Sequence, residues 1–449
     1  MIIADDLSSI IYNNEEIHTP NIERLASLGR PFSRAYCQAS LCNPSRASIM
    51  TGKRPHELGI YTNQPHFRGI YPRMKTIPEY FKDQGYYTVG LGKIFHNWGQ
   101  AIEGDPQSWS EPQEYHYAAH YHDWYVAGRP YQLHFDLRKG PAVQSADVPD
   151  EAYLDGRIAN SAITKLRELQ ETPFFMAVGF WKPHLPYNAP KKYWDLYDSN
   201  NLPKLKYEKP VKGVPDLAYV DSNEARSYTD VDKNGLIPNE KQNELRHGYL
   251  ASISYLDAQL GKVLDELDKL GLTRNTVVVF LSDHGYHAGE HGQFGKWTNF
   301  ELGTRVPLII KKPNISSPGK VSNSIVELID IYPTLLELCG FKDAIPDNRL
   351  SGTSLVPVLN DPTLEIKPAA ISQITRPIGG GTDFTIIGST IRGKDFRYNI
   401  WVQRDTEEVV EEELYSLKSD PYVVENLIQK PEYRDVREMM NNNLLNSLK

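Results

Sequence analysis

The sequence predicts an α/β fold in which helices sandwich a large, mainly parallel sheet, followed by a smaller C-terminal antiparallel sheet with a helix. Up to residue 368, apolar runs of strand length alternate with segments of helical periodicity. The β-branched run at 277–283 is typical of a central parallel strand. After residue 368 short strands follow one another, so we expect two units, residues 1–368 and 369–449.

The elements of the first unit follow from the length and spacing of its apolar runs. Short continuous runs predict strands, and recurrence every three to four residues predicts helices. The expected strands lie at 1–6, 86–91, 174–179, 277–283 and 306–310, and the expected helices at 20–29, 77–84, 151–169, 241–270 and within 325–338. Glycine ends two of these helices, at Gly29 and Gly271.

Two stretches of the first unit lack this regularity. Residues 97–150 are rich in Trp, Tyr, His and Pro, which indicates an irregular insertion near the site. Residues 182–238 contain many prolines and favour loops. In the second unit, the expected elements are strands at 384–391, 396–402 and 413–417 and a helix from about residue 431.

The charge balance excludes several classes of partner. The 449 residues include 49 basic and 57 acidic side chains, which leaves a net charge of −8. This balance argues against nucleic acid, and against a polyanion held by a general basic coat. An anionic substrate therefore requires a local positive pocket. No apolar run reaches the roughly 18 residues of a membrane span, so we expect none.

The three cysteines, Cys37, Cys42 and Cys339, cannot form a disulfide framework. Cys339 lies in an apolar run and is most simply a core residue. A bridge between Cys37 and Cys339 stays open, although nothing in the sequence requires it. The chain starts without the charged and apolar regions of a signal peptide. We expect that the natural chain starts earlier, with a targeting segment for a periplasmic, secreted or lysosome-like compartment.

Cys42 opens the most informative stretch of the chain. It is followed by Pro44, Ser45 and Arg46 and then by Thr51-Gly52, in the pattern C-x-P-S-R-x-x-x-x-T-G. Six residue types in one register make a specific signal. The alternative is a chance loop around a buried structural cysteine.

Acidic residues follow two of the predicted strands. Asp5-Asp6 and Asp283-His284 each come directly after an apolar run. In an open α/β sheet the C-terminal ends of the strands meet at the ligand crevice. Three carboxylates in that place suit a hard cation, Ca²⁺ or Mg²⁺, rather than zinc. Taken alone, Asp5-Asp6 would equally suit a helix cap or a turn.

The order of the short motifs resembles that of the type I sulfatases of the alkaline-phosphatase-like superfamily, and is most similar to the iduronate-2-sulfatase branch. The motifs lie at 4–6, 42–46, 92–96, 182–186, 282–285 and 289–296. The resemblance covers nearly the whole chain. It implies that a maturase oxidises Cys42 to formylglycine, whose hydrate attacks sulfur with one hydroxyl and expels sulfate with the other.

The resemblance also implies roles for the residues of the site. Those implied to bind Ca²⁺, with Mg²⁺ as the alternative, are Asp5, Asp6, Asp283, His284 and an oxygen of modified Cys42. Those implied to act on the ester are Arg46 on the nucleophile, Lys93 and Lys296 on the sulfate, His184 on the leaving oxygen and His96 on the diol. Candidate substrate contacts near the metal strand are Tyr286, His287 and His291.

The expected substrate is a sulfated saccharide, either a glycosaminoglycan or an algal polysaccharide, with 2-O-sulfated uronate among the candidates. Tyr286 stands where the iduronate branch carries Trp, and residues 379–383 offer no basic group for a uronate carboxylate. The two alternative functions are a phosphonate or phosphodiester hydrolase of the same superfamily and a non-catalytic relative that binds sulfated glycans. The His284 pattern favours sulfate over phosphonate, and a binding protein would not need Cys42.

Overall fold

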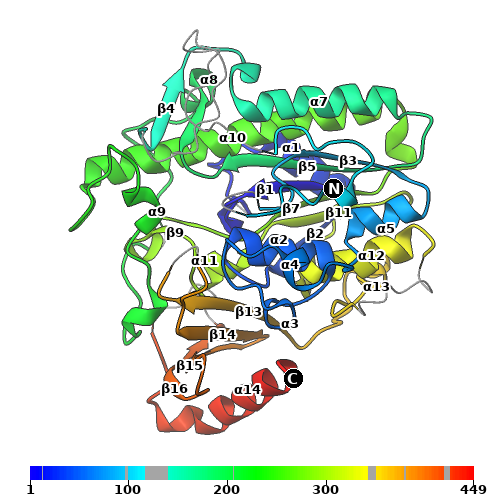
Figure 1. Ribbon diagram of the computed structural model, residues 1–449. Helices are drawn as coiled ribbons and strands as arrows, with labels where there is room; N and C mark the ends of the chain where they lie inside the picture. The colour runs from blue at the N-terminus through cyan, green and yellow to red at the C-terminus, as the bar shows by residue number, and fades with distance from the viewer. Residues whose placement is uncertain are drawn as a thin grey trace.

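The computed structural model describes residues 1–12, 14–96, 100–116, 140–205, 207–341, 350–378, 381–418 and 425–449. They form a large sheet with helices on both faces and a second, smaller sheet packed below it (Figure 1). The insertion expected at 97–150 lies partly outside the described residues, because 97–99 and 117–139 are not among them. The same holds for 379 and 380 in the segment examined for a basic group.

Among the described residues, eight strands form the large sheet, in the order β10-β2-β11-β7-β1-β5-β3 with β12 beside β2. Their bounds are β1 Ile2–Asp5, β2 Arg30–Tyr36, β3 Tyr87–Gly92, β5 Phe174–Pro183, β7 Val278–Ser282, β10 Arg305–Val306, β11 Leu308–Lys311 and β12 Ser322–Glu327. β3, β5, β1 and β7 run parallel, whereas β11 is antiparallel to β7 and β2. The prediction of a mainly parallel sheet is confirmed.

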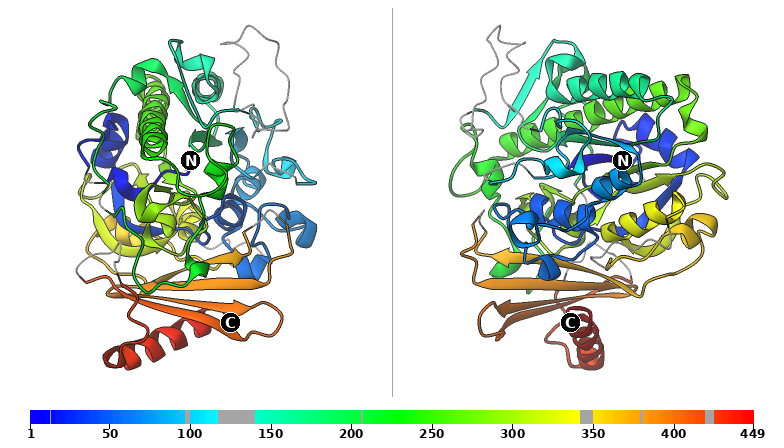
Figure 2. Two further views of the ribbon diagram at one scale, coloured as in Figure 1. Left: turned by 90° about the vertical axis from the view of Figure 1, so that its left-hand side faces the viewer. Right: turned by 45° about the vertical axis from the view of Figure 1, so that its right-hand side comes forward.

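Helices cover both faces of this sheet (Figures 1 and 2). One layer consists of α1 Pro20–Leu28, α7 Leu154–Glu168 and α10 Asn239–Lys269, and the other of α2 Cys42–Thr51, α5 Ile77–Asp83, α12 Ile331–Leu338 and α13 Val356–Asn360. Successive residues of the central strands point to opposite layers. Ile2 packs into the core under α7 and α10, and Ile3 into the core under α5 and α12. Burial on both faces explains why these strands are continuous apolar runs.

The second sheet is antiparallel, with β13 Ala369–Arg376, β14 Ile386–Gly393, β15 Phe396–Gln403 and β16 Val409–Ser416 in chain order. Helix α14, Arg434–Ser447, packs Met440 and Leu444 against one face of the sheet (Figure 2). The other face buries Trp401 together with Phe300 of the large unit. The predicted antiparallel sheet with a helix is therefore present, and β13 begins directly after the boundary expected at 368.

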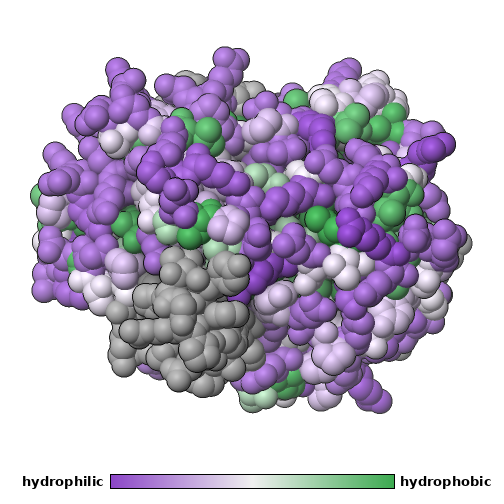
Figure 3. Space-filling model, turned by 90° about the horizontal axis from the view of Figure 1, so that it is seen from above, coloured by the Kyte–Doolittle hydropathy of each residue, from purple (hydrophilic) through white to green (hydrophobic). Residues whose placement is uncertain are grey.

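Short elements complete the described chain, in part around the upper rim of the large sheet. They are α3 Pro55–Leu58, α4 Phe67–Ile70, β4 Val143–Ala146, β6 Tyr187–Pro190, α8 Lys191–Trp194, α9 Asn223–Arg226, β8 His287–Ala288, β9 Phe294–Gly295 and α11 Glu301–Thr304. Seen from above, the surface is mostly hydrophilic and its apolar residues are scattered (Figure 3). Among the described residues, no helix is long and apolar enough to cross a bilayer.

Three strands were not predicted from the sequence pattern, namely β2, β12 and β13. Arg30 conceals β2, yet it is buried and donates to the carbonyl of Ser317 at 3.1 Å. The expected strand at 306–310 is interrupted by Pro307, which has no N–H for a ladder, so it forms β10 and β11. Cys37 and Cys339 are free thiols, so the bridge left open above does not form.

Candidate active site

The site is built at the C-terminal ends of β1 and β7. These strands pair in parallel with Ala4 opposite Ser282, and the amide of Asp283 donates to the carbonyl of Ala4 at 3.2 Å. The residues that follow on each strand, Asp5 and Asp6 on one and Asp283 and His284 on the other, are therefore neighbours. All four side chains are buried.

Three carboxylates and an imidazole converge at this edge. Asp6 has a φ of 67°, a left-handed conformation that is uncommon for a residue other than glycine and recurs at functional sites. His284 Nδ1 lies 3.3 Å from Asp6 Oδ1. Ligand atoms of Asp5, Cys42, Asp283 and His284 all lie within 4.8 Å of one another. This oxygen-rich donor set fits a hard divalent cation.

Cys42 is the first residue of α2 and points into the same cluster. Its Sγ lies 3.3 Å from His284 Nε2, 3.5 Å from Lys93 Nζ and 3.6 Å from Asp5 Oδ1. Pro44 fits the first turn of α2, where a backbone N–H would have no partner within the helix. The helix start thereby places the cysteine among the groups that the motifs predict around it.

Arg46 lies one turn further along α2 and joins three segments. Its Nε donates to Asp283 Oδ2 at 2.7 Å, its Nη1 donates to the carbonyl of Ile94 at 3.1 Å, and its Nη2 lies 3.7 Å from Asp5 Oδ1. The side chain is fully buried. The guanidinium therefore balances two buried carboxylates while it holds the loop after β3 against them.

Two lysines contact the carboxylates of the cluster. Lys93, directly after β3, contacts Asp5. Lys296, directly after β9, places Nζ 2.8 Å from Asp6 Oδ1. Burial alone would raise the pKa of Asp5, but the positive charges of Lys93, His184 and Arg46 outweigh it and hold that pKa well below its usual value. Asp5 is thus kept ionised.

His184 borders the cluster and is its most exposed imidazole, with 14% of its side chain accessible. Its Nε2 lies 3.0 Å from Glu224 Oε1 and 3.9 Å from Asp6 Oδ2. Burial and Lys296 act to lower the pKa of His184. The carboxylates of Asp6, Glu224 and Asp5 act in the other direction and leave that pKa raised. The charge pattern therefore favours an imidazolium.

His96 has the opposite environment. It is buried, and neither ring nitrogen has a hydrogen-bond partner among the described residues. Burial, and after it the charge of Lys93, hold the pKa of His96 well below its usual value. A neutral imidazole with unengaged nitrogens can accept a proton.

Glu224 belongs to the site but was missed by the sequence analysis. It comes from the short helix α9 and bridges two predicted residues, with Oε1 3.0 Å from His184 Nε2 and Oε2 3.3 Å from Lys296 Nζ. Burial would raise the pKa of Glu224, but Lys296 and His184 lower it well below its usual value. No local pattern could identify this residue, because it lies in the proline-rich stretch 182–238 and in no recognised motif.

The three candidate substrate contacts near β7 pack into the protein rather than into the cluster. The hydroxyl of Tyr286 accepts a hydrogen bond from Tyr187 at 2.9 Å, and its ring stacks on Tyr249. The Nε2 of His287 lies 2.9 Å from the hydroxyl of Thr298. The ring of His291 packs edge-on against Phe300. The structure thus brings the predicted metal and ester-binding residues together and leaves these three beside them.

Comparisons with known proteins agree with this arrangement. The protein-family model described as Sulfatase matches residues 1–341. Iduronate 2-sulfatase of Mus musculus is 33% identical over 94% of this chain and 89% of its own length. A phosphonate monoester hydrolase from Silicibacter pomeroyi superposes with a TM-score of 0.78 at 20% identity, over 99% of this chain and 94% of that one.

A second solved structure, of a protein in complex with its substrate D-glucosamine-2-N,6-O-disulfate, superposes with a TM-score of 0.75 at 24% identity. The alignment covers 100% of this chain and 96% of that one. At such identities the two superpositions establish the shared fold and nothing further.

The environment of Arg46 predicts a large effect on stability. In the Arg46→Ala variant, Asp283 and Asp5 lose their buried counter-charge, so we expect the free energy of unfolding to fall by about 3–5 kcal/mol. Urea denaturation followed by circular dichroism measures it. The matched control is Arg274→Ala, at an exposed position, which should change stability by less than about 0.5 kcal/mol. Equal stability of the two variants would contradict the counter-charge role.

Proposed function

The chain belongs to the sulfatase family and is a sulfuric ester hydrolase, and from this premise we propose that it desulfates a saccharide, with formylglycine made from Cys42 as nucleophile and Ca²⁺ as metal. The observation that carries the proposal is the position of Cys42 Sγ, within 3.6 Å of Asp5, Lys93 and His284. An unmodified cysteine or serine would be left as a stable sulfate ester. The modification, made by a formylglycine-generating maturase, supplies a hydrated aldehyde with a second hydroxyl for release.

The metal site in this proposal consists of Asp5, Asp6, Asp283 and His284, with Mg²⁺ as the alternative ion. When bound, the cation supplies Lewis-acid stabilisation of charge on the sulfate oxygens. Arg46 contributes from the protein side, because its guanidinium offsets the negative charge that Asp5 and Asp283 would otherwise impose on residue 42. The nucleophilic oxygen is thereby favoured in its ionised form.

Lys93 and Lys296 are proposed to bind the sulfate group. Both are buried, and each already lies on a carboxylate of the cluster. A buried ammonium in a low-dielectric pocket binds an anion more strongly than an exposed one does. These two side chains supply the local positive charge that a chain of net charge −8 requires for an anionic substrate.

Two imidazoles with opposite protonation are proposed to move the protons. His184, held protonated by Glu224 and Asp6, donates from Nε2 to the oxygen of the departing sugar. His96, held neutral by burial, accepts the proton of the second hydroxyl on residue 42. The pairing of a raised and a lowered pKa in one site is the arrangement expected for an acid and a base.

The substrate is proposed to be a terminal or near-terminal sulfated sugar of a polysaccharide. The likeness to iduronate 2-sulfatase supports 2-O-sulfated uronate among the candidates. The burial of Cys42, Lys93 and Lys296 favours entry of one end of a chain over binding along an open groove. A phosphonate hydrolase remains the second candidate because of the shared fold, while the family match favours sulfate. The exported compartment expected from the sequence stays a prediction.

The nucleophile assignment predicts the outcome of a substitution at residue 42. Protein co-expressed with a maturase should hydrolyse aryl sulfates faster than aryl phosphonates, and Cys42→Ala should lower kcat by at least about 10⁴-fold, as for loss of other catalytic nucleophiles. Steady-state kinetics and mass spectrometry of the peptide that holds residue 42 provide the measurements. Cys339→Ala is the control and should stay active. The mechanism is wrong if Cys42→Ala retains most of its turnover.

The metal assignment predicts reversible inactivation. Chelation should remove activity, and Ca²⁺ or Mg²⁺ should restore it, because the donor set is rich in hard carboxylate oxygens. Elemental analysis of the purified enzyme identifies the resident ion. Stoichiometric zinc, together with failure of Ca²⁺ to restore turnover, would overturn the assignment.

The bridge formed by Glu224 predicts a dependence on the leaving group. Because Glu224 acts through His184, both His184→Ala and Glu224→Gln should lower kcat on a sulfated sugar by about 10²-fold or more. Both should affect nitrophenyl sulfate far less, since nitrophenol leaves without a proton. Glu240→Gln, exposed at the start of α10, is the matched control. An equal loss on both substrates would remove the acid role from His184.

A further inference from the structure

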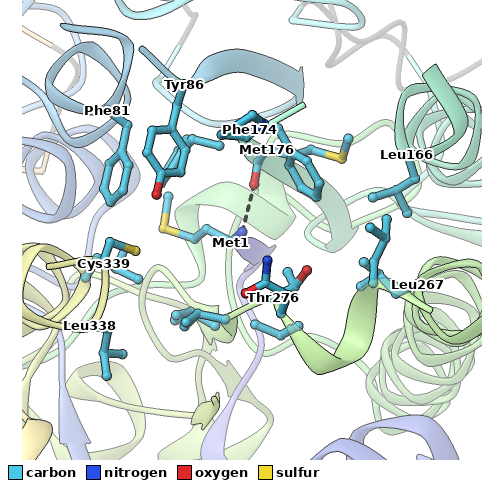
Figure 4. Close-up of a pocket in the computed structure, with 18 of the residues that line it drawn as sticks. Met1, Phe81, Tyr86, Leu166, Phe174, Met176, Leu267, Thr276, Leu338 and Cys339 are labelled. Carbon is cyan, nitrogen blue, oxygen red and sulfur yellow. Dashed lines mark hydrogen bonds between the residues drawn. The ribbon is translucent and has the colours of Figure 1, made fainter. Parts of the chain in front are cut away.

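A cavity of about 700 Å³ lies at the end of the large sheet opposite the candidate active site. The first residues of β5 and β7, Phe174 and Val278, line it, whereas the active site lies at the other ends of the parallel strands. Figure 4 shows Met1 in the middle of this cavity, with its nitrogen bonded to Met176. The proposed function makes no use of this region.

The cavity is a gap in the sheet itself. β1 lies between β5 and β7, and its first paired residue, Ile2, lies opposite Val178 and Phe280. Residues 174–177 of β5 continue beyond this point and pair with β3 on their other side. Val278 and Val279 of β7 likewise pair with β11 on their other side. Beyond Met1, the space between the two strands is therefore as wide as one strand, in the middle of a sheet.

Both walls of this gap are apolar. From the layer of α7 and α10 it is lined by Leu166, Val263 and Leu267. From the layer of α5 and α12 it is lined by Phe81 and Leu338, with Cys339 at the end of α12 (Figure 4). A strand has side chains on alternate faces, so a strand in this gap would bury one set against each layer.

The nitrogen of Met1 occupies the position of a strand amide. It donates to the carbonyl of Met176 at 2.7 Å, and the amide of Val178 donates to the carbonyl of Met1 at 2.9 Å, as in a parallel ladder. Burial lowers the pKa of this amino group from 8.0 to about 5. A charged ammonium is therefore disfavoured here, and a neutral amide fits the same hydrogen bond without that cost.

We propose that this cavity is a docking groove for an extended apolar segment joined to the nitrogen of Met1, which continues β1 and pairs in parallel with β5 and β7. The register of β1 places the residue adjoining Met1 beside Met176 and Val278, with its side chain toward Leu267. The second added residue faces Phe81 and the third reaches Phe174. Such an addition completes the sheet by the backbone pairing that also governs strand addition between proteins.

Three extended chains, each produced behind a cleavable tag, test the proposal against the 449-residue chain. The first carries Val-Leu-Ile before Met1, the second Gly-Ser-Gly, and the third Val-Leu-Asp, which turns a carboxylate toward Leu267. Val-Leu-Ile should raise Tm by about 5 °C, because three apolar side chains become buried. It should also slow alkylation of Cys339, which lines the cavity, by about tenfold. Gly-Ser-Gly and Val-Leu-Asp should give neither effect.

Alkylation is read by mass spectrometry of each cysteine peptide, with buried Cys37 as the internal control. If Val-Leu-Ile leaves Tm and Cys339 labelling as Gly-Ser-Gly does, the groove assignment is wrong. If Val-Leu-Asp stabilises the chain as well as Val-Leu-Ile does, the register is wrong. If free Val-Leu-Ile peptide protects Cys339 of the 449-residue chain equally well at millimolar concentration, the proposed covalent continuity with Met1 is wrong.

Discussion

The structure depends on the balance of buried charge at one edge of its large sheet. Asp5, Asp6 and Asp283 are fully buried there, and an unpaired carboxylate in such a place costs several kcal/mol. Arg46, Lys93 and Lys296 supply the opposite charge within 4 Å. Neither set would be stable in the interior without the other, so the sheet edge can form only when all the segments that carry them are in place.

This requirement explains why the site draws on segments from the whole length of the chain. The carboxylates follow two neighbouring parallel strands, Arg46 comes from a helix on one face, and Lys93 follows the next strand but one. Lys296 lies in a loop that the second unit holds. Arg376 of β13 donates to the carbonyl of Trp297 at 2.8 Å, and Arg397 of β15 pairs with buried Glu301 at 2.6 Å. The C-terminal sheet thus acts on the chemistry by holding the loop that carries a sulfate-binding lysine.

The same charge balance separates the protonation states of the two histidines. His184 faces Asp6 and Glu224 and is favoured as the cation, whereas His96 lies near Lys93 without a carboxylate partner and is favoured as the neutral base. Ester cleavage and sulfate release need an acid and a base in succession. A single cluster of fixed charges supplies both, because the two imidazoles lie against opposite signs of charge.

The sequence by itself determined the α/β class, the parallel run of central strands, and the identity of the residues grouped around Cys42. These features are local, since burial on both faces makes a strand continuously apolar and the reactive residues lie in short motifs. Only the tertiary structure decided which of these groups touch, that Glu224 joins His184 to Lys296, and that Tyr286 is held by Tyr187 in the core. It also decided β2 and β12, whose strand character comes from pairing with each other across nearly 300 residues. Such contacts depend on strand register and on packing between distant segments, and neither leaves a periodic signal along the chain.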